Sequence, residues 1–324
     1  MASEDVEFPA VHPQVRALLR AMGDIAGAGA DAAPAEPTPA DLAAERAEYL
    51  DATLRMGGAA ELVEAVEDVV IPAGPDGALR LPARVYTPLN AAGTRDLIVW
   101  LHGGGWYVGD IESFDRVGRS LANAAGAKVL LPEYRLAPEH RWPTQTADAD
   151  AIVRWARAAG AEQLDVDPDR VAVGGDSAGG QLAVVAARHA RDDGLPPLRE
   201  LLLVYPCLDP TVGSDAMREF EHGPMLTKAD VERCWSFYRD GAARDDDPDF
   251  APLVATDWEG LPKTWIAVAG QDPLRDDGLR LAELLGDAAI PTRVRVFEDM
   301  VHGFLRWGGV VDATGELLAW VSHR

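Results

Sequence analysis

Ser177 is the residue whose setting points most directly to chemistry. It lies in the glycine-rich stretch GGDSAGG at 174–180, between an apolar run and a helical pattern. The stretch lacks the lysine of a phosphate-binding loop and the G-x-G-x-x-G spacing of a dinucleotide fold. It fits G-x-S-x-G instead, in which the serine stands on a sharp strand-to-helix turn and the flanking glycines relieve the crowding. We therefore expect Ser177 to be a nucleophile.

His302 is the expected base, because a serine hydroxyl is a poor nucleophile unless a base accepts its proton. In hydrolases with this motif the acid and then the histidine follow the serine along the chain. The chain has seven histidines, and His302 comes directly after an expected strand at 292–298. Its imidazole can therefore reach the edge of the sheet where the serine stands. His323 is the penultimate residue, and chain ends are poor places for a fixed base.

Asp272 is the acid expected to hold the imidazole of His302 in the required tautomer. It lies in a loop two residues beyond an expected strand at 264–270. Two further acids, Asp276 and Asp277, fall in the first turn of the helix that follows, where the helix dipole already accounts for negative charge. Asp272 is therefore the better candidate.

Acyl transfer also needs hydrogen-bond donors for the developing oxyanion. The run HGGG at 102–105 follows an early apolar segment, and consecutive glycines let backbone N–H groups turn inward. We expect donors from this glycine run, and the N–H of Ala178, the residue after the nucleophile, to complete the oxyanion hole. Each such donor stabilises a transition state by about 3 kcal/mol. His102 is expected to hold this loop by hydrogen bonding.

These residues would be positioned by an alternation of short β-rich runs and longer helical patterns. The inner runs are almost wholly apolar, which is typical of parallel strands covered on both faces. The second run alternates, as an edge or antiparallel strand does. The pattern predicts an α/β fold with a mostly parallel, doubly wound sheet. Strands are expected at 65–71, 79–88, 96–102, 127–134, 170–175, 200–206, 264–270 and 292–298, and helices at 114–125, 144–159, 178–193, 277–286 and 312–322.

Two regions fall outside this alternation and have the character of additions to the sheet. Residues 1–57 hold two helical patterns joined by an Ala-, Gly- and Pro-rich stretch at 23–40, which is expected to be mobile. Residues 208–250 hold another helical pattern between Pro- and Asp-rich loops. A cap over an active site has this character, and so does an ordinary surface excursion.

Composition excludes several classes of function. The formal net charge of −23 argues against nucleic acid and against anionic membrane surfaces, which both need a basic footprint. The apolar runs are too short to span a bilayer, and the acidic N-terminus does not fit a signal peptide. Cys207 and Cys234 follow no metal or redox spacing and are expected to be free thiols. We expect a cytoplasmic protein without membrane insertion.

Taken together, the motifs resemble the hormone-sensitive-lipase-like carboxylesterases, the bacterial family IV of the α/β-hydrolase superfamily. The resemblance spans about 65–324 and implies an α/β-hydrolase fold, with an eight-stranded, mostly parallel sheet, helices on both faces and a helical cap. Residues 1–57 and 208–250 would form that cap on a catalytic domain of 58–324. The motifs are HGGGW at 102–106, EYRLAPEHRWP at 133–143, GGDSAGG at 174–180, DPLRDDG at 272–278 and HGF at 302–304.

The resemblance implies a serine esterase for short- to medium-chain carboxylic esters that needs no metal or cofactor, with Gly103, Gly104 and Ala178 as the donors of the oxyanion hole. It also suggests a homodimer formed through an edge of the sheet. Four side chains are candidates for the substrate pocket or for ordinary packing: Trp106, Met225, Trp235 and Phe237. Two alternatives stay open, a lactone or amide hydrolase using the same site and a non-catalytic receptor on the same fold.

Overall fold

A computed structural model describes residues 10–23, 37–74, 76–89 and 93–322. Its centre is one eight-stranded sheet in the order β1-β2-β4-β3-β5-β6-β7-β8. The first two strands pair antiparallel with each other, β2 pairs antiparallel with β4, and all later pairs are parallel. The strands are β1 (Ala65–Ala73), β2 (Leu79–Thr87), β3 (Leu97–Leu101), β4 (Lys128–Pro132), β5 (Val171–Asp176), β6 (Leu201–Val204), β7 (Thr264–Gln271) and β8 (Thr292–Val301).

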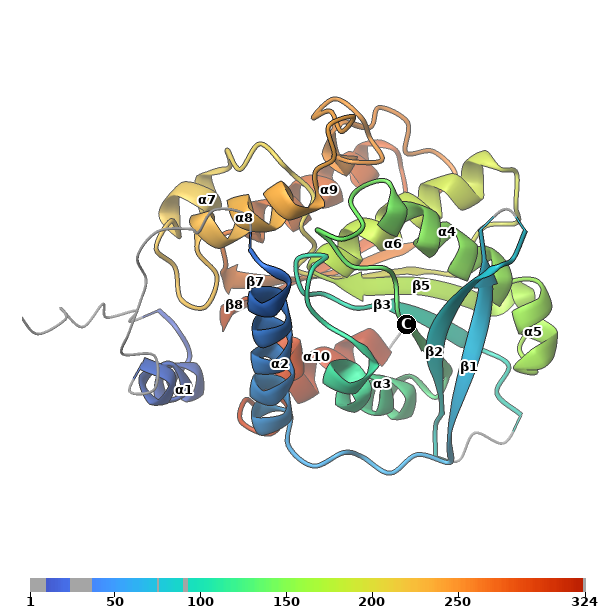
Figure 1. Ribbon diagram of the computed structural model, residues 1–324, viewed down its shortest axis with the longest axis horizontal. Helices are drawn as coiled ribbons and strands as arrows, with labels where there is room; N and C mark the ends of the chain where they lie inside the picture. The colour runs from blue at the N-terminus through green and yellow to red at the C-terminus, as the bar shows by residue number, and fades with distance from the viewer. Residues whose placement is uncertain (1–9, 24–36, 75, 90–92, 323–324) are drawn as a thin grey trace, which may run out of the picture.

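Helices cover both faces of this sheet. The central strands β3, β5 and β6 are buried along their whole length, so they need apolar partners on either side. Figure 1 shows α4, α6 and α9 on one face and α3 and α10 on the other. The helices are α3 (Ile111–Ala125), α4 (Thr144–Ala156), the short α5 (Ala159–Gln163), α6 (Ala178–Asp192), α9 (Arg275–Asp287) and α10 (Ala313–Ser322).

Local signals explain where several of these helices begin and end. Helix α3 begins with a capping box in which the side chains of Asp110 and Ser113 bond each other's backbone N–H groups. It ends at Gly126, whose left-handed backbone is readily adopted by glycine. The first turn of α6 has no side-chain cap, although its N-cap residue, Ser177, is of a type that often supplies one. That serine hydroxyl is therefore left for another partner.

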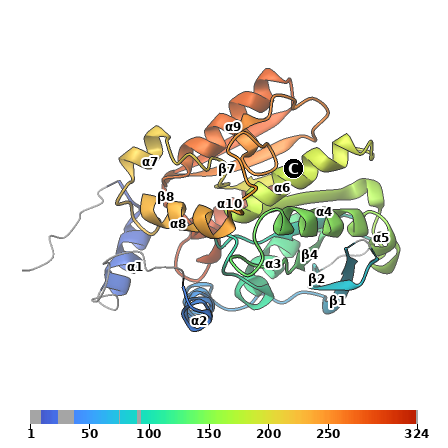
Figure 2. The same ribbon diagram turned by 45° about the horizontal axis from the view of Figure 1, so that its top comes forward.

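Four helices lie outside the alternating pattern: α1 (Pro13–Gly23), α2 (Pro39–Met56), α7 (Asp215–Glu219) and α8 (Lys228–Tyr238). Helix α2 lies beside α8 in both ribbon views (Figures 1 and 2), and the side chains of Glu45 and Arg233 join them by two hydrogen bonds. Helix α1 lies elsewhere, against the C-terminal part of the chain, where Gln14 bonds Asp312. The predicted mobile joint at 23–40 falls mostly outside the described residues.

The predicted architecture is confirmed: the sheet has eight strands, is mostly parallel and carries helices on both faces. All eight strands lie where the apolar runs placed them. The alternating run at 79–88 was expected to be an edge strand or an antiparallel strand. It is antiparallel, but it is not at the edge of the sheet. Strand β1 takes the edge, and β2 is sandwiched between β1 and β4. The short helices α5 and α7 were not predicted.

Candidate active site

Ser177 stands on a tight turn between β5 and α6, in a backbone conformation that side chains rarely adopt, with φ of 53°. The turn is held by its own amide, which donates to the Val204 carbonyl at 3.0 Å, and by its carbonyl, which accepts from the Cys207 amide at 3.1 Å. A Cβ at Gly175 would come within 2.5 Å of the Gly179 backbone. The turn can therefore form only with glycine there, as the sequence motif predicts.

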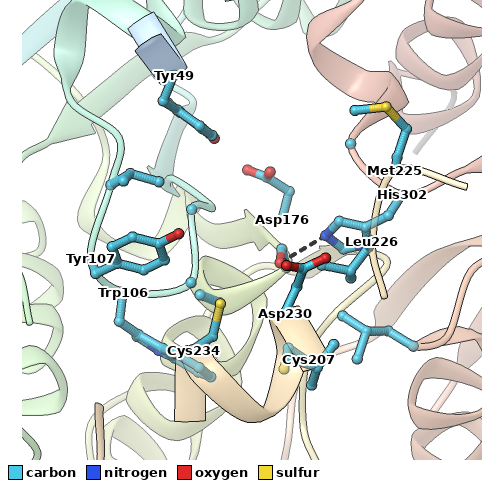
Figure 3. Close-up of a pocket in the computed structure, with 18 of the residues that line it drawn as sticks. Tyr49, Trp106, Tyr107, Asp176, Cys207, Met225, Leu226, Asp230, Cys234 and His302 are labelled. Carbon is cyan, nitrogen blue, oxygen red and sulfur yellow. Dashed lines mark hydrogen bonds between the residues drawn. The ribbon is translucent and has the colours of Figure 1, made fainter. Parts of the chain in front are cut away.

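Ser177, His302 and Asp272 come together at the carboxyl edge of the sheet. His302 Nε2 is 3.0 Å from Ser177 Oγ, and its Nδ1 is 2.7 Å from Asp272 Oδ2. Figure 3 shows His302 on the wall of the cavity, with the first of these two bonds drawn as a dashed line. A carboxylate can only accept, so Nδ1 carries a proton and Nε2 is free to accept the serine proton. The Asp272 side chain is fully buried, and its other oxygen accepts from the Leu274 amide at 2.8 Å. The three predicted residues thus form one hydrogen-bonded chain.

Asp276 and Asp277 do more than complement a helix dipole. Asp276 accepts a hydrogen bond from the Ala216 amide at 2.7 Å. Asp277 accepts from the amides of Leu208 and Asp209 at 2.7 and 3.1 Å, and burial raises the pKa of its carboxyl to about 8. Both acids therefore anchor the segment that leads from β6 into the inserted helices, and neither is the partner of the histidine.

The glycine loop at 102–105 differs from the expectation by one residue. The Gly103 amide does not face the cavity, because it donates to Asp176 Oδ1 at 3.1 Å. Gly104 and Gly105 line the cavity together with Ala178, and both have positive φ, 114° and 56°. The inclusion of Gly103 in the oxyanion hole is therefore wrong, since its N–H is already engaged. The residues of this loop and of the α6 start that do line the cavity are Gly104, Gly105 and Ala178.

His102 is a buried structural residue. Its ring is stacked on that of Tyr134, with centroids 4.4 Å apart, and its Nδ1 lies 2.8 Å from the Gly103 carbonyl. Burial lowers the pKa of this imidazole to about 4, so the ring is neutral at pH 7 and donates to that carbonyl. The Tyr134 hydroxyl in turn donates to the His102 carbonyl at 2.8 Å. The expected role of His102 in holding the loop fits these contacts.

The cavity above Ser177 has a volume of about 290 Å³, and two of the four predicted pocket residues line it. Trp106 and Met225 are on its wall. Trp235 and Phe237 are not: Trp235 packs against Trp106 with ring centroids 4.5 Å apart, and Phe237 packs edge-on against Tyr107 at 5.1 Å. Both belong to the packing beneath the wall, which corrects the prediction for these two side chains.

The sequence patterns do not identify five other residues of the cavity wall. Helix α2 contributes Tyr49, and the turn after His302 contributes Arg306. Helix α8 contributes Asp230, Val231 and Cys234. Positions 230, 231 and 234 share one face of a helix, so helical spacing could have grouped them. Helical spacing does not show whether this face of α8 or the face with Trp235 lines the cavity.

The two cysteines are free thiols, as predicted; Cys207 is buried and Cys234 is half-buried. Burial raises the pKa of Cys207 well above its usual value and that of Cys234 to about 12, so both stay protonated at pH 7. Within the described residues, no cluster of three or more His, Cys, Asp or Glu side chains could hold a metal ion. No described helix is both long and apolar enough to cross a membrane.

Comparison with known proteins places this geometry in a family. A family model described as alpha/beta hydrolase fold matches residues 98–306. The carboxylic ester hydrolase LipN of Mycobacterium tuberculosis is 40% identical over 78% of this chain and 69% of its own length. The ethyl acetate hydrolase of Pseudomonas putida is 33% identical over 74% of this chain and 76% of its own. The hyperthermophilic esterase of the archaeon Pyrobaculum calidifontis is 30% identical, with a TM-score of 0.86 over 97% of each chain.

The matched region contains Ser177 and His302, and the likeness to the esterase structure extends to both groups of additional helices. The chain belongs to the α/β-hydrolase fold family, in its hormone-sensitive-lipase-like group of carboxylesterases.

Proposed function

We propose that this protein is a serine carboxylesterase that hydrolyses short- to medium-chain esters through an acyl-serine intermediate. The observation that carries the proposal is the position of His302, whose two ring nitrogens lie within hydrogen-bond distance of Ser177 Oγ and Asp272 Oδ2. This is the arrangement in which a base can take a serine proton while a buried carboxylate stabilises the imidazolium that forms.

In the proposed mechanism Ser177 Oγ attacks the ester carbonyl while His302 Nε2 takes its proton. The tetrahedral oxyanion binds the amides of Gly104, Gly105 and Ala178. Ala178 is the first residue of α6, and the first amides of a helix have no partner within it. His302 then returns the proton to the leaving alcohol, and a water activated by the same nitrogen releases the acid. Every proton is carried by side chains of this chain, so the reaction needs no cofactor.

We also propose that residues 1–57 and 208–250 form the cap on a catalytic domain of 58–324. Tyr49 from α2 and the α8 residues Asp230, Val231 and Cys234 line the cavity, so both segments supply part of its roof. Among the described N-terminal helices only α2 reaches the cavity, because α1 packs against the end of the sheet. By this criterion the part of the cap that lies over the cavity is α2 with α8.

The size of the cavity supports small substrates. A volume of about 290 Å³ is at the lower end of the range for small-molecule sites. Among the relatives, one is an ethyl acetate hydrolase, which is consistent with short esters. A homodimer and a cytoplasmic location also stay predictions, the first tested by the mass of the protein in solution.

The test is hydrolysis of p-nitrophenyl acetate and butyrate. We expect turnover by the wild-type protein and a fall of at least about 10⁴-fold for Ser177→Ala. Ser120→Ala, which changes a serine on α3 outside the cavity wall, is the matched control and should keep full activity. Full activity in Ser177→Ala would remove the nucleophile assignment. A panel of lactones and amides distinguishes ester hydrolysis from the related acyl-transfer reactions.

A further inference from the structure

A second cavity of about 180 Å³ lies behind the active site. Its walls are the C-terminal end of α2, the helices α3 and α10, and the segment that follows the turn η3 (Phe304–Arg306). These elements lie next to one another in Figure 1. Among the residues that the structure describes, Arg306 alone lines both this cavity and the one above Ser177. Its side chain is therefore the partition between the two spaces.

Arg306 is held in this position from three sides. Its Nη1 donates to the Thr53 hydroxyl of α2 at 2.8 Å, and its guanidinium carbon lies 4.4 Å from the centre of the Tyr49 ring. Its Nη2 lies 3.0 Å from where a Cβ at Gly303 would be, so a side chain at position 303 would crowd the guanidinium. Contacts on α2 and on its own turn thus fix the partition.

The partition stands at the alcohol end of the site. The alcohol oxygen of an ester must come within about 3 Å of His302 Nε2 to receive its proton. Gly303 follows His302 directly, Arg306 ends the 3-10 turn that comes next, and all three residues line the cavity. Arg306 thus lies on the histidine side of the cavity, and we take the alcohol group to extend toward it and the acyl group to extend away from it.

We propose that Arg306 sets the upper size limit of the alcohol group by closing the active-site cavity against the second cavity. The proposal rests on the proposed esterase function and deepens it. With Arg306 in place, a long alcohol group meets the guanidinium. Without it, such a group can extend into the space between α2, α3 and α10.

The experiment measures kcat/KM for acetates of methanol, ethanol, butanol, hexanol and octanol, and for ethyl esters of acids from C2 to C8. For Arg306→Ala we expect kcat/KM for hexyl and octyl acetate to rise about tenfold or more relative to ethyl acetate, the scale on which a pocket discriminates by size. The acid series should change much less. If Arg306→Ala does not fold, as judged by its melting temperature, Arg306→Ser tests the same truncation.

Two further variants separate volume from charge. Arg306→Met removes the charge and keeps most of the length, so its alcohol profile should stay close to that of the wild type. Ser120 lies on the wall of the second cavity and outside the active site. Ser120→Phe should fill that space. As a single variant it should hydrolyse ethyl acetate as the wild type does. Combined with Arg306→Ala, it should reverse the rise in kcat/KM for hexyl and octyl acetate.

An unchanged alcohol profile in an active Arg306→Ala variant would overturn this inference and leave the proposed esterase function standing. An equal change in Arg306→Met would also overturn it, because charge rather than volume would then set the limit. A wider acid profile in place of a wider alcohol profile would show that the partition stands at the other end of the ester. If the wild-type protein hydrolyses no ester of either series, the proposed function fails, and this inference fails with it.

Discussion

Asp176 Oδ1 accepts a hydrogen bond from the Gly103 amide at 3.1 Å, which ties the turn that holds the nucleophile to the loop that faces it. The same oxygen lies 3.3 Å from the Trp100 indole nitrogen, which also donates to it. Asp176 is almost completely buried, and this burial raises the pKa of its carboxyl to about 6. The side chain next to the nucleophile thus has a positioning role, through the backbone of the glycine loop.

Replacing Asp176 should therefore lower kcat with little change in KM. Asp176→Ala leaves the Gly103 amide without its acceptor, and small displacements of catalytic groups cost about 10²-fold in rate. Asp176→Asn keeps an acceptor oxygen and should retain most of the wild-type kcat. Steady-state kinetics with p-nitrophenyl acetate measure both parameters. If the alanine and asparagine variants were equally active, the hydrogen bond to Gly103 would have no bearing on catalysis.

Gly105→Ala should lower kcat/KM by about 10²-fold, the scale expected for loss of one oxyanion donor. Residue 105 has φ of 56°, and a Cβ there would lie 3.1 Å from the Cys234 Cβ and closer still to the thiol. Gly286→Ala is the matched control, because its Cβ would meet nothing within 4 Å and it lies inside α9. It should keep full activity and stabilise the fold by about 0.5–1 kcal/mol.

The double variant Gly105→Ala with Cys234→Ala then separates two causes. Removing the thiol relieves the contact but leaves the positive φ. Partial recovery of kcat/KM would assign the remainder to backbone strain, whereas complete recovery would show that the contact with Cys234 alone was responsible.

The strands and the three residues Ser177, Asp272 and His302 could be predicted from the sequence because each signal is local. An almost continuous apolar run marks a strand covered on both faces, and a polar residue just after such a run must lie at the carboxyl edge of the sheet. All three residues follow strands of the parallel part of the sheet. Their meeting is therefore a consequence of topology, and no detail of side-chain packing is needed to foresee it.

The oxyanion loop and the pocket depend on contacts that no local pattern contains. Which amide of the run 103–105 faces the cavity is decided by the bond from Gly103 to Asp176, a residue 73 positions away. Helix α8 has apolar side chains on two adjacent faces. Packing against Trp106 buries the face that carries Trp235 and leaves that of Cys234 at the cavity.

The ion pair of Glu45 and Arg233 should hold α2 and α8 together. Its carboxylate and guanidinium are joined at 2.6 and 3.0 Å, and the Arg233 guanidinium also covers the Phe237 ring at 4.7 Å. A double-mutant cycle with Glu45→Gln and Arg233→Met should give a coupling energy of about 1 kcal/mol, because the pair is only partly exposed. The single variants should raise KM and leave kcat unchanged.

The matched control is the ion pair of Asp51 and Arg55 on the outer surface of α2, where both side chains are more than half exposed. Its cycle should give less than about 0.5 kcal/mol and no change in KM. A coupling between Glu45 and Arg233 no larger than this would show that α2 and α8 are held together by packing instead.

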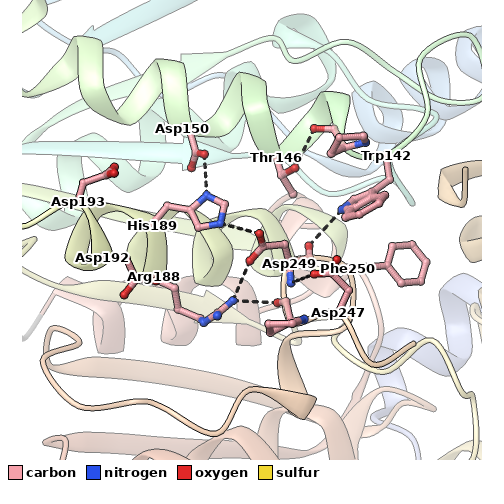
Figure 4. Close-up of polar contacts among 12 residues, drawn as sticks. Trp142, Thr146, Asp150, Arg188, His189, Asp192, Asp193, Asp247, Asp249 and Phe250 are labelled. Atoms are coloured by element: carbon pink, nitrogen blue, oxygen red, sulfur yellow. Dashed lines mark hydrogen bonds and ion pairs between the residues drawn. The ribbon is translucent and has the colours of Figure 1, made fainter. Parts of the chain in front are cut away.

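A charged histidine joins α4, α6 and the loop before β7 (Figure 4). His189 Nδ1 lies 2.6 Å from Asp150 Oδ2, and its Nε2 lies 2.9 Å from Asp249 Oδ2. The hydrogen bonds to Asp150 and then to Asp249 raise the pKa of this imidazole to about 10. Two cations lie near it: Arg188, which bonds the other oxygen of Asp249, and Arg154, which pairs with Asp193.

The stability that His189 contributes should therefore fall as the pH rises. Its pKa in the folded protein is above the ordinary 6.5, so the contribution is complete below pH 6.5 and is lost as the pH rises to about 10. At pH 6, His189→Gln should lower the free energy of unfolding by about 1–3 kcal/mol, and the difference from the wild type should shrink by pH 10. Urea unfolding at pH 6, 8 and 10 measures it, with His222→Gln as the exposed control. A difference that stayed constant or grew with pH would mean that the ring is neutral between its two carboxylates.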